Sequence, residues 1–232
     1  MKFFNTAGPV NQEEHYKLDP LTRWNLEEIL SLIEQKKYFI LHAPRQTGKT
    51  SCLLALRDYL NKEDKYACIY CNFEVGQSAR NNVKDGMAAI ISELNKQCSF
   101  VLSEYNKIQN ITKFVESAGY HDALNSFLSK VSIDSPKPII LFIDEIDALI
   151  GDTLISVLRQ LRSGYSDRPK AFPQTIILCG VRDIKDYRIH RSDDDVITGG
   201  SAFNIKAKSL TLGNFSELEV RELYYEHTKE TG

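Results

Sequence analysis

The chain has 232 residues, a formal net charge of −2 and an apolar fraction of 42%. This length is enough for one α/β domain with a full core, or for such a domain with a small appendage. The near-neutral charge does not indicate broad nonspecific binding to nucleic acid, and the sequence contains neither a secretory leader nor an apolar run long enough to span a membrane.

The first predicted elements are a polar lead-in, a helix and a strand. Residues 1–24 are loop-like, since Gly8-Pro9 and Asp19-Pro20 break regular structure. Asn25 is expected to cap a helix over residues 26–35, and the apolar run at 38–42 predicts the first strand.

The segment after this strand predicts a phosphate-binding loop. Residues 43–50 end in Gly48-Lys49-Thr50 and lead into a predicted helix over 51–60. Strand, tight loop and helix are the context in which backbone N–H groups and a helix N-terminus bind phosphate. Ala43 stands where the pattern usually has glycine, which costs little unless that position needs a positive φ. We expect Lys49 to reach the β- and γ-phosphates and Thr50 to hold Mg²⁺.

The middle of the chain predicts a second strand over residues 66–73 and a helix that Ser78 caps. The apolar face of this helix consists of Val83, Met87, Ile90, Ile91 and Leu94. Residues 99–131 are helical but irregular in pattern, and we interpret them as an insertion over the sheet.

A second candidate for chemistry follows the third predicted strand. The apolar run at 138–143 is typical of a strand buried on both faces, and it ends at Asp144-Glu145. Asp144 at the strand tip is placed to complete a Mg²⁺ site with Thr50, and Glu145 beside it can polarise an attacking water. Asp147 is expected to cap a helix or face solvent rather than bind metal.

The remaining elements complete an alternating pattern. Asp152 is expected to cap a further helix, strands are predicted over 174–181 and 207–212, and Ser216 with Glu219 forms a capping box for a last helix. Five strands alternating with helices predict an α/β protein with a parallel sheet covered on both faces. Cysteines in apolar runs, among them Cys52, Cys68 and Cys179, favour reduced thiols in a cytoplasmic protein.

The two motifs at 43–50 and 141–145 together resemble those of P-loop NTPases, specifically the AAA+-related signal-transduction (STAND) and archaeal-type ATPases. With residues 4–10 and 180–187, the likeness extends to bacterial AAA-like ATP-binding proteins and covers essentially the whole chain. The resemblance implies a three-layer P-loop NTPase fold with strand order 5-1-4-3-2, and ATP or ADP with Mg²⁺ as ligands. The nucleotide-binding residues that it implies are Ala43, Pro44, Arg45, Gln46, Thr47, Gly48, Lys49, Thr50, Ser51, Pro9, Val10 and Arg23.

Several roles rest on this resemblance alone. Pro9, Val10 and Arg23 are expected to wall the nucleotide base, and Arg182 after the fourth strand is expected to sense the γ-phosphate. Arg159 or Arg162 takes the place from which oligomeric relatives supply an arginine to a neighbour, although a solvated helix face explains them as well.

The domain interpretation is a nucleotide-flanking segment at residues 1–24 and an ATPase core at 25–232. Relatives carry a helical or winged-helix lid after the core, whereas only one predicted helix follows the fifth strand here. We therefore expect the lid to be absent, which leaves nucleotide exchange and turnover by the isolated core open.

Three alternatives compete with an ATPase that acts as a switch or assembly module. Residues 61–64 match a guanine-recognition pattern, but they follow the first helix of the fold instead of a late strand. A small-molecule kinase would share the loop and use Arg182, Arg188 and Arg191 as a lid. A nucleotide-binding scaffold would hydrolyse little, although Lys49 and Glu145 argue for chemistry. Expected partners are ATP and a protein or second copy, without a membrane, and nucleic acid is not indicated.

Overall fold

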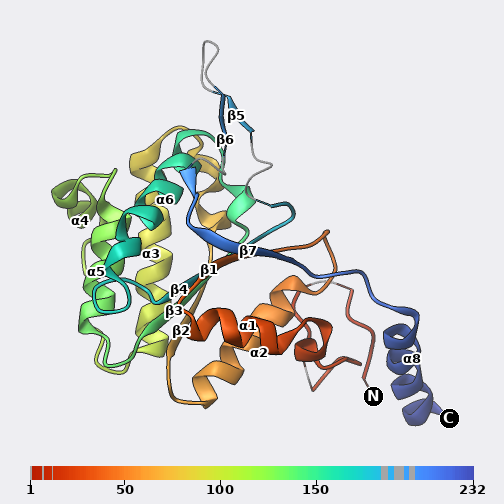
Figure 1. Ribbon diagram of the computed structural model, residues 1–232. Coiled ribbons are helices and arrows are strands. Elements are labelled where there is room, and N and C mark those ends of the chain that lie inside the picture. The colour runs from red at the N-terminus through yellow and green to blue at the C-terminus, as the bar shows by residue number, and fades with distance from the viewer. Residues whose placement is uncertain (1, 7, 12, 184–187, 191–195, 199–201) are drawn as a thin grey trace.

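A parallel sheet of five strands forms the centre of the molecule (Figure 1). The computed structural model describes residues 2–6, 8–11, 13–183, 188–190, 196–198 and 202–232. The sheet strands are β1 (Tyr38–His42), β2 (Ala67–Asn72), β3 (Ile139–Asp144), β4 (Thr175–Gly180) and β7 (Lys206–Thr211). Their spatial order is β2-β3-β4-β1-β7, so the predicted order 5-1-4-3-2 is confirmed, with β7 as the fifth strand.

The central strands form because their residues are apolar without interruption. Every residue of β3 and β4 is buried, as a parallel sheet covered on both faces requires. The parallel register places His42 beside Gly180 and Asn72 beside Asp144. The carboxyl ends of these strands therefore meet at one edge of the sheet, where ligands bind in open α/β folds.

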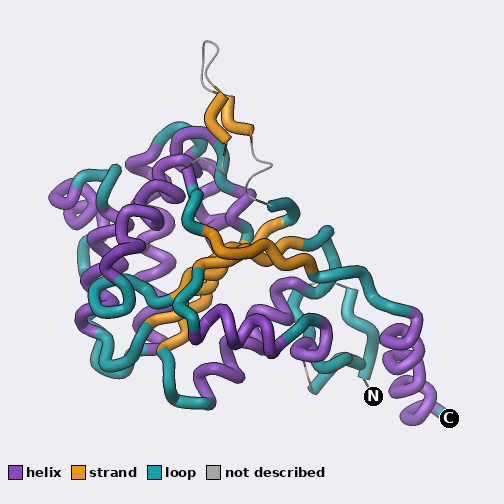
Figure 2. The backbone as a smooth tube through the Cα atoms, viewed as in Figure 1, coloured by secondary structure: helices purple, strands orange, loops and turns teal. Residues whose placement is uncertain are grey.

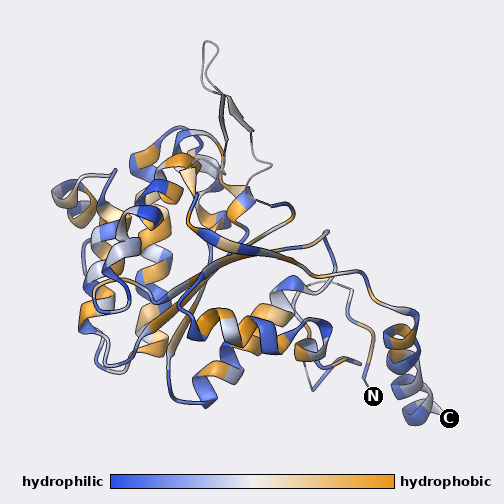
Figure 3. Ribbon diagram, viewed as in Figure 1, coloured by the Kyte–Doolittle hydropathy of each residue, from blue (hydrophilic) through white to orange (hydrophobic). Residues whose placement is uncertain are grey.

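Helices cover both faces of the sheet (Figures 1 and 2). One layer holds α1 (Leu26–Glu34) and α2 (Lys49–Lys62), which share a core with β1, β3 and β4. The opposite layer holds α3 (Val83–Val101), α5 (Ala123–Asp134) and α6 (Gly151–Ser163), with α4 (Ile111–Ala118) packed outside them. Figure 3 shows the apolar residues concentrated on the strands and on the helix faces that meet them. The three predicted layers are thus present.

Short 3-10 helices join several of these elements. They comprise Pro20–Arg23, Phe73–Ala79, Ile146–Ala148 and Gly164–Asp167. A separate antiparallel pair, β5 (Arg188–His190) and β6 (Val196–Thr198), extends from the core (Figure 1). The predicted arginine lid and the stretch at 180–187 lie partly outside the described residues.

Two predicted helix starts are wrong. Ser78 lies inside a 3-10 helix, and the residue that caps α3 is Asn82, whose side chain accepts a hydrogen bond from the Asp85 backbone. The N-cap of α6 is Ile150, and Asp152 lies in the first turn. By contrast, Asn25 caps α1 and Ser216 forms the predicted capping box at the start of α8 (Glu217–Thr231).

The cysteines occupy the core, as predicted. All five are free and buried. Cys68 and Cys71 belong to different hydrophobic clusters on opposite faces of the sheet, which separates the C-x-x-C pair as expected for strand residues three positions apart.

The two ends of the chain lie close together, beside the lower right of Figure 1. The Lys2 backbone N–H donates to Glu230 of α8, and the Phe4 ring contacts those of Tyr224 and His227. No residue of α8 is buried. Among the described residues, none of the helices combines the length and the apolar character needed to cross a membrane.

Candidate functional site

The predicted phosphate-binding loop joins β1 to α2. Gly48 is the N-cap of α2 and has a φ of 85°, a conformation that favours glycine. Ala43 is fully buried and is not among the residues with positive φ, so alanine is accommodated without strain at the position where glycine is usual. The loop therefore has the backbone geometry that its sequence predicts.

Lys49 lies across this loop. Its side-chain Nζ donates to the carbonyls of Ala43 and Pro44, at 3.1 Å each. Lys49 is 9% exposed, and these two backbone oxygens hold its ammonium close to the loop. A phosphate chain in the loop would offer this ammonium stronger, charged acceptors.

Asp144 at the end of β3 is the centre of a hydrogen-bond cluster. Its Oδ2 accepts from Thr50 Oγ1 and from the Tyr70 hydroxyl, both at 2.8 Å. Its Oδ1 accepts from the Glu145 backbone N–H at 2.9 Å, and the residue is 1% exposed. The structure thus brings together Thr50 and Asp144, the two residues predicted to hold Mg²⁺, and their hydroxyl and carboxylate oxygens are ligands that suit this ion.

Glu145 is held in an unusual backbone conformation beside this cluster. Its φ is 53°, and strained residues of this kind are frequent at functional sites. Burial raises the pKa of its carboxyl above the ordinary value, and the neighbouring Asp144 and Asp147 raise it further. Asp147 Oδ2 accepts from the Val181 backbone N–H at 3.0 Å, so this carboxylate holds the chain after β4, and it does not cap a helix.

A cavity of about 1010 Å³ lies beside these groups. Its wall includes the loop residues Gly48, Lys49 and Thr50, together with Glu145. The N-terminal segment supplies Pro9 and Val10, and the Val10 N–H donates to Ser51 Oγ at 3.2 Å. The C-terminal segment supplies Phe215 and Leu223. Segments from the start, middle and end of the chain therefore enclose the same space.

Arg23 also lines this cavity, and each of the three nitrogens of its guanidinium donates to a protein group. It donates to the Thr47 carbonyl at 2.6 Å, to the Gly213 carbonyl at 2.8 Å and to Glu219 Oε1 at 2.9 Å. Its Cζ lies 3.8 Å from the centre of the Phe215 ring. These contacts were not predicted, because nothing in the sequence pairs residue 23 with residues 213–219.

Tyr70, the partner of Asp144, is a residue that the sequence analysis missed. The predicted strand order puts β2 beside β3, and in the observed register Asn72 is the partner of Asp144. Tyr70 lies two positions before Asn72 and so projects on the same face of β2. The strand order together with this periodicity was the signal that could have found it.

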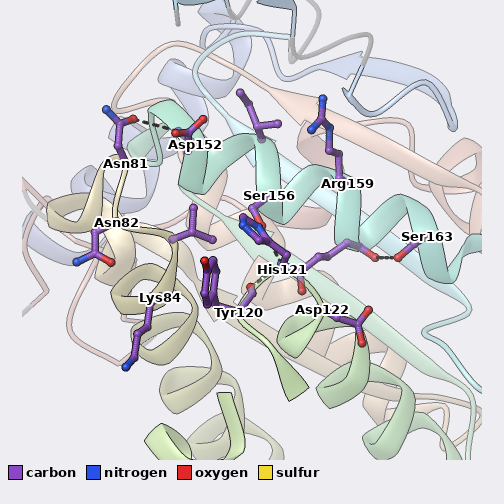
Figure 4. A pocket seen from close by; sticks show the side chains of 13 residues that line it. Asn81, Asn82, Lys84, Tyr120, His121, Asp122, Asp152, Ser156, Arg159 and Ser163 are labelled. Atoms are coloured by element: carbon purple, nitrogen blue, oxygen red, sulfur yellow. Dashed lines mark hydrogen bonds between the residues drawn. The ribbon is translucent and has the colours of Figure 1, made fainter. Parts of the chain in front are cut away.

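Arg45 of the loop lines the cavity as well, whereas the arginines expected to act as a sensor or on a neighbour lie outside its wall. Arg182 follows β4 and is exposed, and it is not among the lining residues. Arg159 and Arg162 are exposed on α6. Arg159 instead lines a second cavity of about 900 Å³ between α3, the α4–α5 turn and α6 (Figure 4).

This second cavity shares no lining residue with the first. Gln160 lines this cavity, and its side-chain amide donates to the Tyr120 carbonyl at 3.2 Å and to Ser156 Oγ at 2.9 Å. The Gln160 side-chain oxygen accepts from the Leu124 N–H at 2.8 Å. These polar groups satisfy one another and connect the helices, so the cavity carries no arrangement that indicates a reaction.

The strand order, the loop between β1 and α2 and the acidic end of β3 define a P-loop NTPase fold. The family model described as "Nephrocystin 3, N-terminal" matches residues 22–173. The chain therefore belongs to this family. The matched region includes the loop and both motif carboxylates, and it ends before β4.

Solved structures share the fold at low sequence identity. A Walker-type ATPase of Pyrococcus abyssi matches with a TM-score of 0.55 and 16% identity, over 98% of this chain and 62% of that one. Cdc6p of Pyrobaculum aerophilum matches with a TM-score of 0.53 and 15% identity, over 90% and 48% of the two chains. A chain of Drosophila ORC bound to DNA matches with a TM-score of 0.54 and 11% identity, over 89% and 32%.

The chain thus spans less than two thirds of each of these structural relatives. No curated protein sequence matches it. At these identities the structural likeness establishes the fold alone.

Proposed function

We propose that this protein binds ATP with Mg²⁺ and hydrolyses it, and that it works as a molecular switch or assembly module of the STAND-related kind. The observation that carries the proposal is the contact of the Thr50 hydroxyl with the buried Asp144 carboxylate, at 2.8 Å, behind a cavity that Thr50, Glu145 and the phosphate-binding loop line. A polar hydroxyl–carboxylate pair at a strand end next to such a loop is the arrangement that nucleotide hydrolysis requires.

The loop residues 43–51 bind the phosphates in this proposal. Backbone N–H groups of the loop and the N-terminus of α2 attract the negative charge. Lys49 exchanges the carbonyls of Ala43 and Pro44 for the β- and γ-phosphate oxygens. Thr50 and Asp144 hold Mg²⁺, which when bound neutralises the charge that develops on the phosphates.

Glu145 is the proposed catalytic base. Its carboxylate orients a water molecule in line with the γ-phosphate and accepts the proton that this water loses. The raised pKa of Glu145 brings its basicity closer to that of a base used near neutral pH. Neighbouring Asp144 remains the partner of Thr50 and Tyr70, so the two adjacent carboxylates have different roles.

The base wall and the arginine roles complete the proposal. Pro9, Val10 and Arg23 wall the adenine side of the cavity. Arg182 serves as the γ-phosphate sensor, which requires its side chain to move toward the cavity when nucleotide binds. Arg159 or Arg162 acts on a neighbouring copy or protein partner, since both are exposed on α6.

The buried free thiols fit a reducing, cytoplasmic location.

The test is ATP and GTP binding and hydrolysis with Mg²⁺, for wild type beside Lys49→Ala and Glu145→Gln. We expect selective ATP binding, weaker binding in Lys49→Ala, and retained binding without turnover in Glu145→Gln. Equal loss of binding in the two variants would contradict the separate roles. Tight binding without turnover in wild type would favour a nucleotide-binding scaffold. Transfer of phosphate to an acceptor molecule would favour a kinase. Binding of neither nucleotide would refute the proposal.

A further inference from the structure

Arg23 joins two parts of the chain that lie far apart in the sequence, the phosphate-binding loop and the segment that leads into α8. Its side chain is only 4% exposed. Nη1 donates to Thr47, Nη2 to Gly213 and Nε to Glu219, while the guanidinium lies over the Phe215 ring. A planar guanidinium offers donors in several fixed directions, and a lysine ammonium cannot reproduce that geometry.

The contact with Thr47 controls the orientation of one loop peptide. In a trans peptide the C=O and N–H point in opposite directions, so the bond that holds the Thr47 carbonyl at Arg23 turns the Gly48 N–H the other way. Gly48 has a φ of 85°, and glycine is free enough in φ and ψ for the preceding peptide to reorient. Arg23 therefore limits the freedom of a peptide whose N–H belongs to the phosphate-binding loop.

The opposite side of the guanidinium holds the start of α8. Glu219 uses both carboxylate oxygens: Oε2 accepts from the Ser216 N–H at 2.6 Å, and Oε1 accepts from Arg23 Nε at 2.9 Å. The pKa of Glu219 is lowered first by the Ser216 backbone N–H and further by Arg23, so the pair is ionised at neutral pH. Because α8 buries no residue, its position depends on a few contacts of this kind.

We propose that Arg23 is a positioning residue that couples phosphate binding at the loop to the docking of residues 213–219. This inference rests on the proposed nucleotide binding and adds a regulatory connection to it. Coupling between two sites is reciprocal, so bound phosphates tighten the docking of α8, and displacement of α8 weakens phosphate binding to the same extent. A partner that displaced α8 would thereby promote nucleotide release.

The first experiment measures ADP binding by the full chain, with pyrophosphate and adenosine as separate competitors. We expect Arg23→Gln to weaken ADP and pyrophosphate binding about tenfold, as the loss of a charge-assisted hydrogen bond implies. Glu219→Gln is expected to weaken both about threefold, since the Glu219 side chain is partly exposed. Glutamine still completes the capping box at this position, so α8 keeps its N-terminus.

Competition by pyrophosphate and by adenosine distinguishes two roles of Arg23, coupling through the phosphate-binding loop and direct contact with the nucleotide base. If Arg23 acts through the loop, Arg23→Gln weakens pyrophosphate binding, whatever its effect on competition by adenosine. Loss of adenosine binding with no change in pyrophosphate binding would overturn the inference and make Arg23 a base contact only.

Glu217→Gln is the matched control. Glu217 lies in the same first turn of α8, and its side chain is 81% exposed and pairs with Arg221 on the same helix. This variant should bind ADP as wild type does. If Arg23→Gln does not fold, the comparison of Glu219→Gln with Glu217→Gln still decides, because equal affinities in these two would refute the coupling.

Hydrogen exchange of the α8 amides gives a readout that a purely structural role would not affect. ADP should slow exchange in α8 of wild type and of Glu217→Gln, but have less effect in Glu219→Gln. A wild-type protein that binds ADP without any change in α8 exchange would refute the coupling alone. A wild-type protein that binds neither ADP nor pyrophosphate would refute the proposed function with it.

Discussion

At the scale of single residues, the surroundings of Glu145 in the candidate site favour the neutral form of its carboxyl group. It follows the buried Asp144 directly and is itself partly buried, with φ at 53°. Burial is the largest cause of its raised pKa, and the charges of Asp144 and Asp147 act in the same direction. The folded protein therefore binds a proton at Glu145 more tightly than the unfolded chain does, and ionisation of this residue costs stability.

We expect Glu145→Gln to raise the free energy of unfolding near neutral pH in the absence of nucleotide. Wild type loses stability as the pH rises from 4.5, the ordinary value, through the raised pKa in the folded state, and this loss persists at higher pH. Glutamine has a similar shape and never ionises, so the difference should vanish in acid. Urea unfolding across this pH range measures it.

Glu104→Gln on the exposed surface is the control for that measurement, and it should show no such pH-dependent gain. Equal stability of Glu145→Gln and wild type at neutral pH would mean that the folded protein solvates the carboxylate of Glu145 well. The same variant addresses turnover in the proposed function, so stability and catalysis are tested in one protein.

The sequence predicted the local part of the site and missed its long-range part. Lys49, Thr50, Asp144 and Glu145 could be proposed from the sequence because local patterns define their positions. The first two begin the helix after the loop, and the other two stand at the end of a strand. Tyr70 was missed because its contact with Asp144 depends on the register of two strands. The partners of Arg23 at residues 213–219 were missed because no sequence pattern joins segments so far apart.

At the scale of elements, the contact between α3 and α6 depends on a glycine. A Cβ built on Gly86 of α3 would lie 2.6 Å from Cγ2 of Thr153 on α6, and Thr153 is fully buried. The absence of a side chain at Gly86 thus allows the two helices to approach closely on the face of the sheet opposite α2.

Gly86→Ala tests this packing because two effects oppose each other. Alanine improves helix propensity by about 1 kcal/mol, whereas an extra methyl in a well-packed contact costs about 1–3 kcal/mol. We expect a net loss of about 1 kcal/mol in the free energy of unfolding, measured in urea. Ser92→Ala at an exposed position of α3 is the control and should not destabilise. A gain in Gly86→Ala would show that the helices can separate without cost.

The elements themselves were predictable where their apolar pattern is continuous. The buried runs gave the strands to within about two residues at each end, and the alternation with helices gave the layers. The start of α3 was wrong because Ser78 and Asn82 both lie in a polar stretch before the first apolar residue, Val83, and only the local backbone decides which of them caps.

At the scale of the whole molecule, the candidate site depends on both ends of the chain. Phe215 and Leu223 complete a cavity whose other walls are the N-terminal segment and the loop. The sequence analysis predicted a last helix after the fifth strand and assigned it no part in the site. In the structure this helix already contributes to the cavity wall, while none of its own residues is buried.

Removal of residues 214–232 should therefore affect nucleotide binding more than stability. The free energy of unfolding should change little, because the deleted part buries no side chain and the three hydrophobic clusters of buried residues lie in residues 29–212. ADP affinity should fall about tenfold or more, because Phe215, Leu223 and Glu219 are lost together. Urea unfolding and ADP titration measure the two quantities.

A shorter deletion of residues 228–232 removes the Lys2–Glu230 contact but keeps the cavity wall, and it should bind ADP normally. If the longer deletion unfolds the protein, α8 belongs to the cooperative core; if it leaves ADP affinity unchanged, the C-terminal wall of the cavity does not contact the nucleotide.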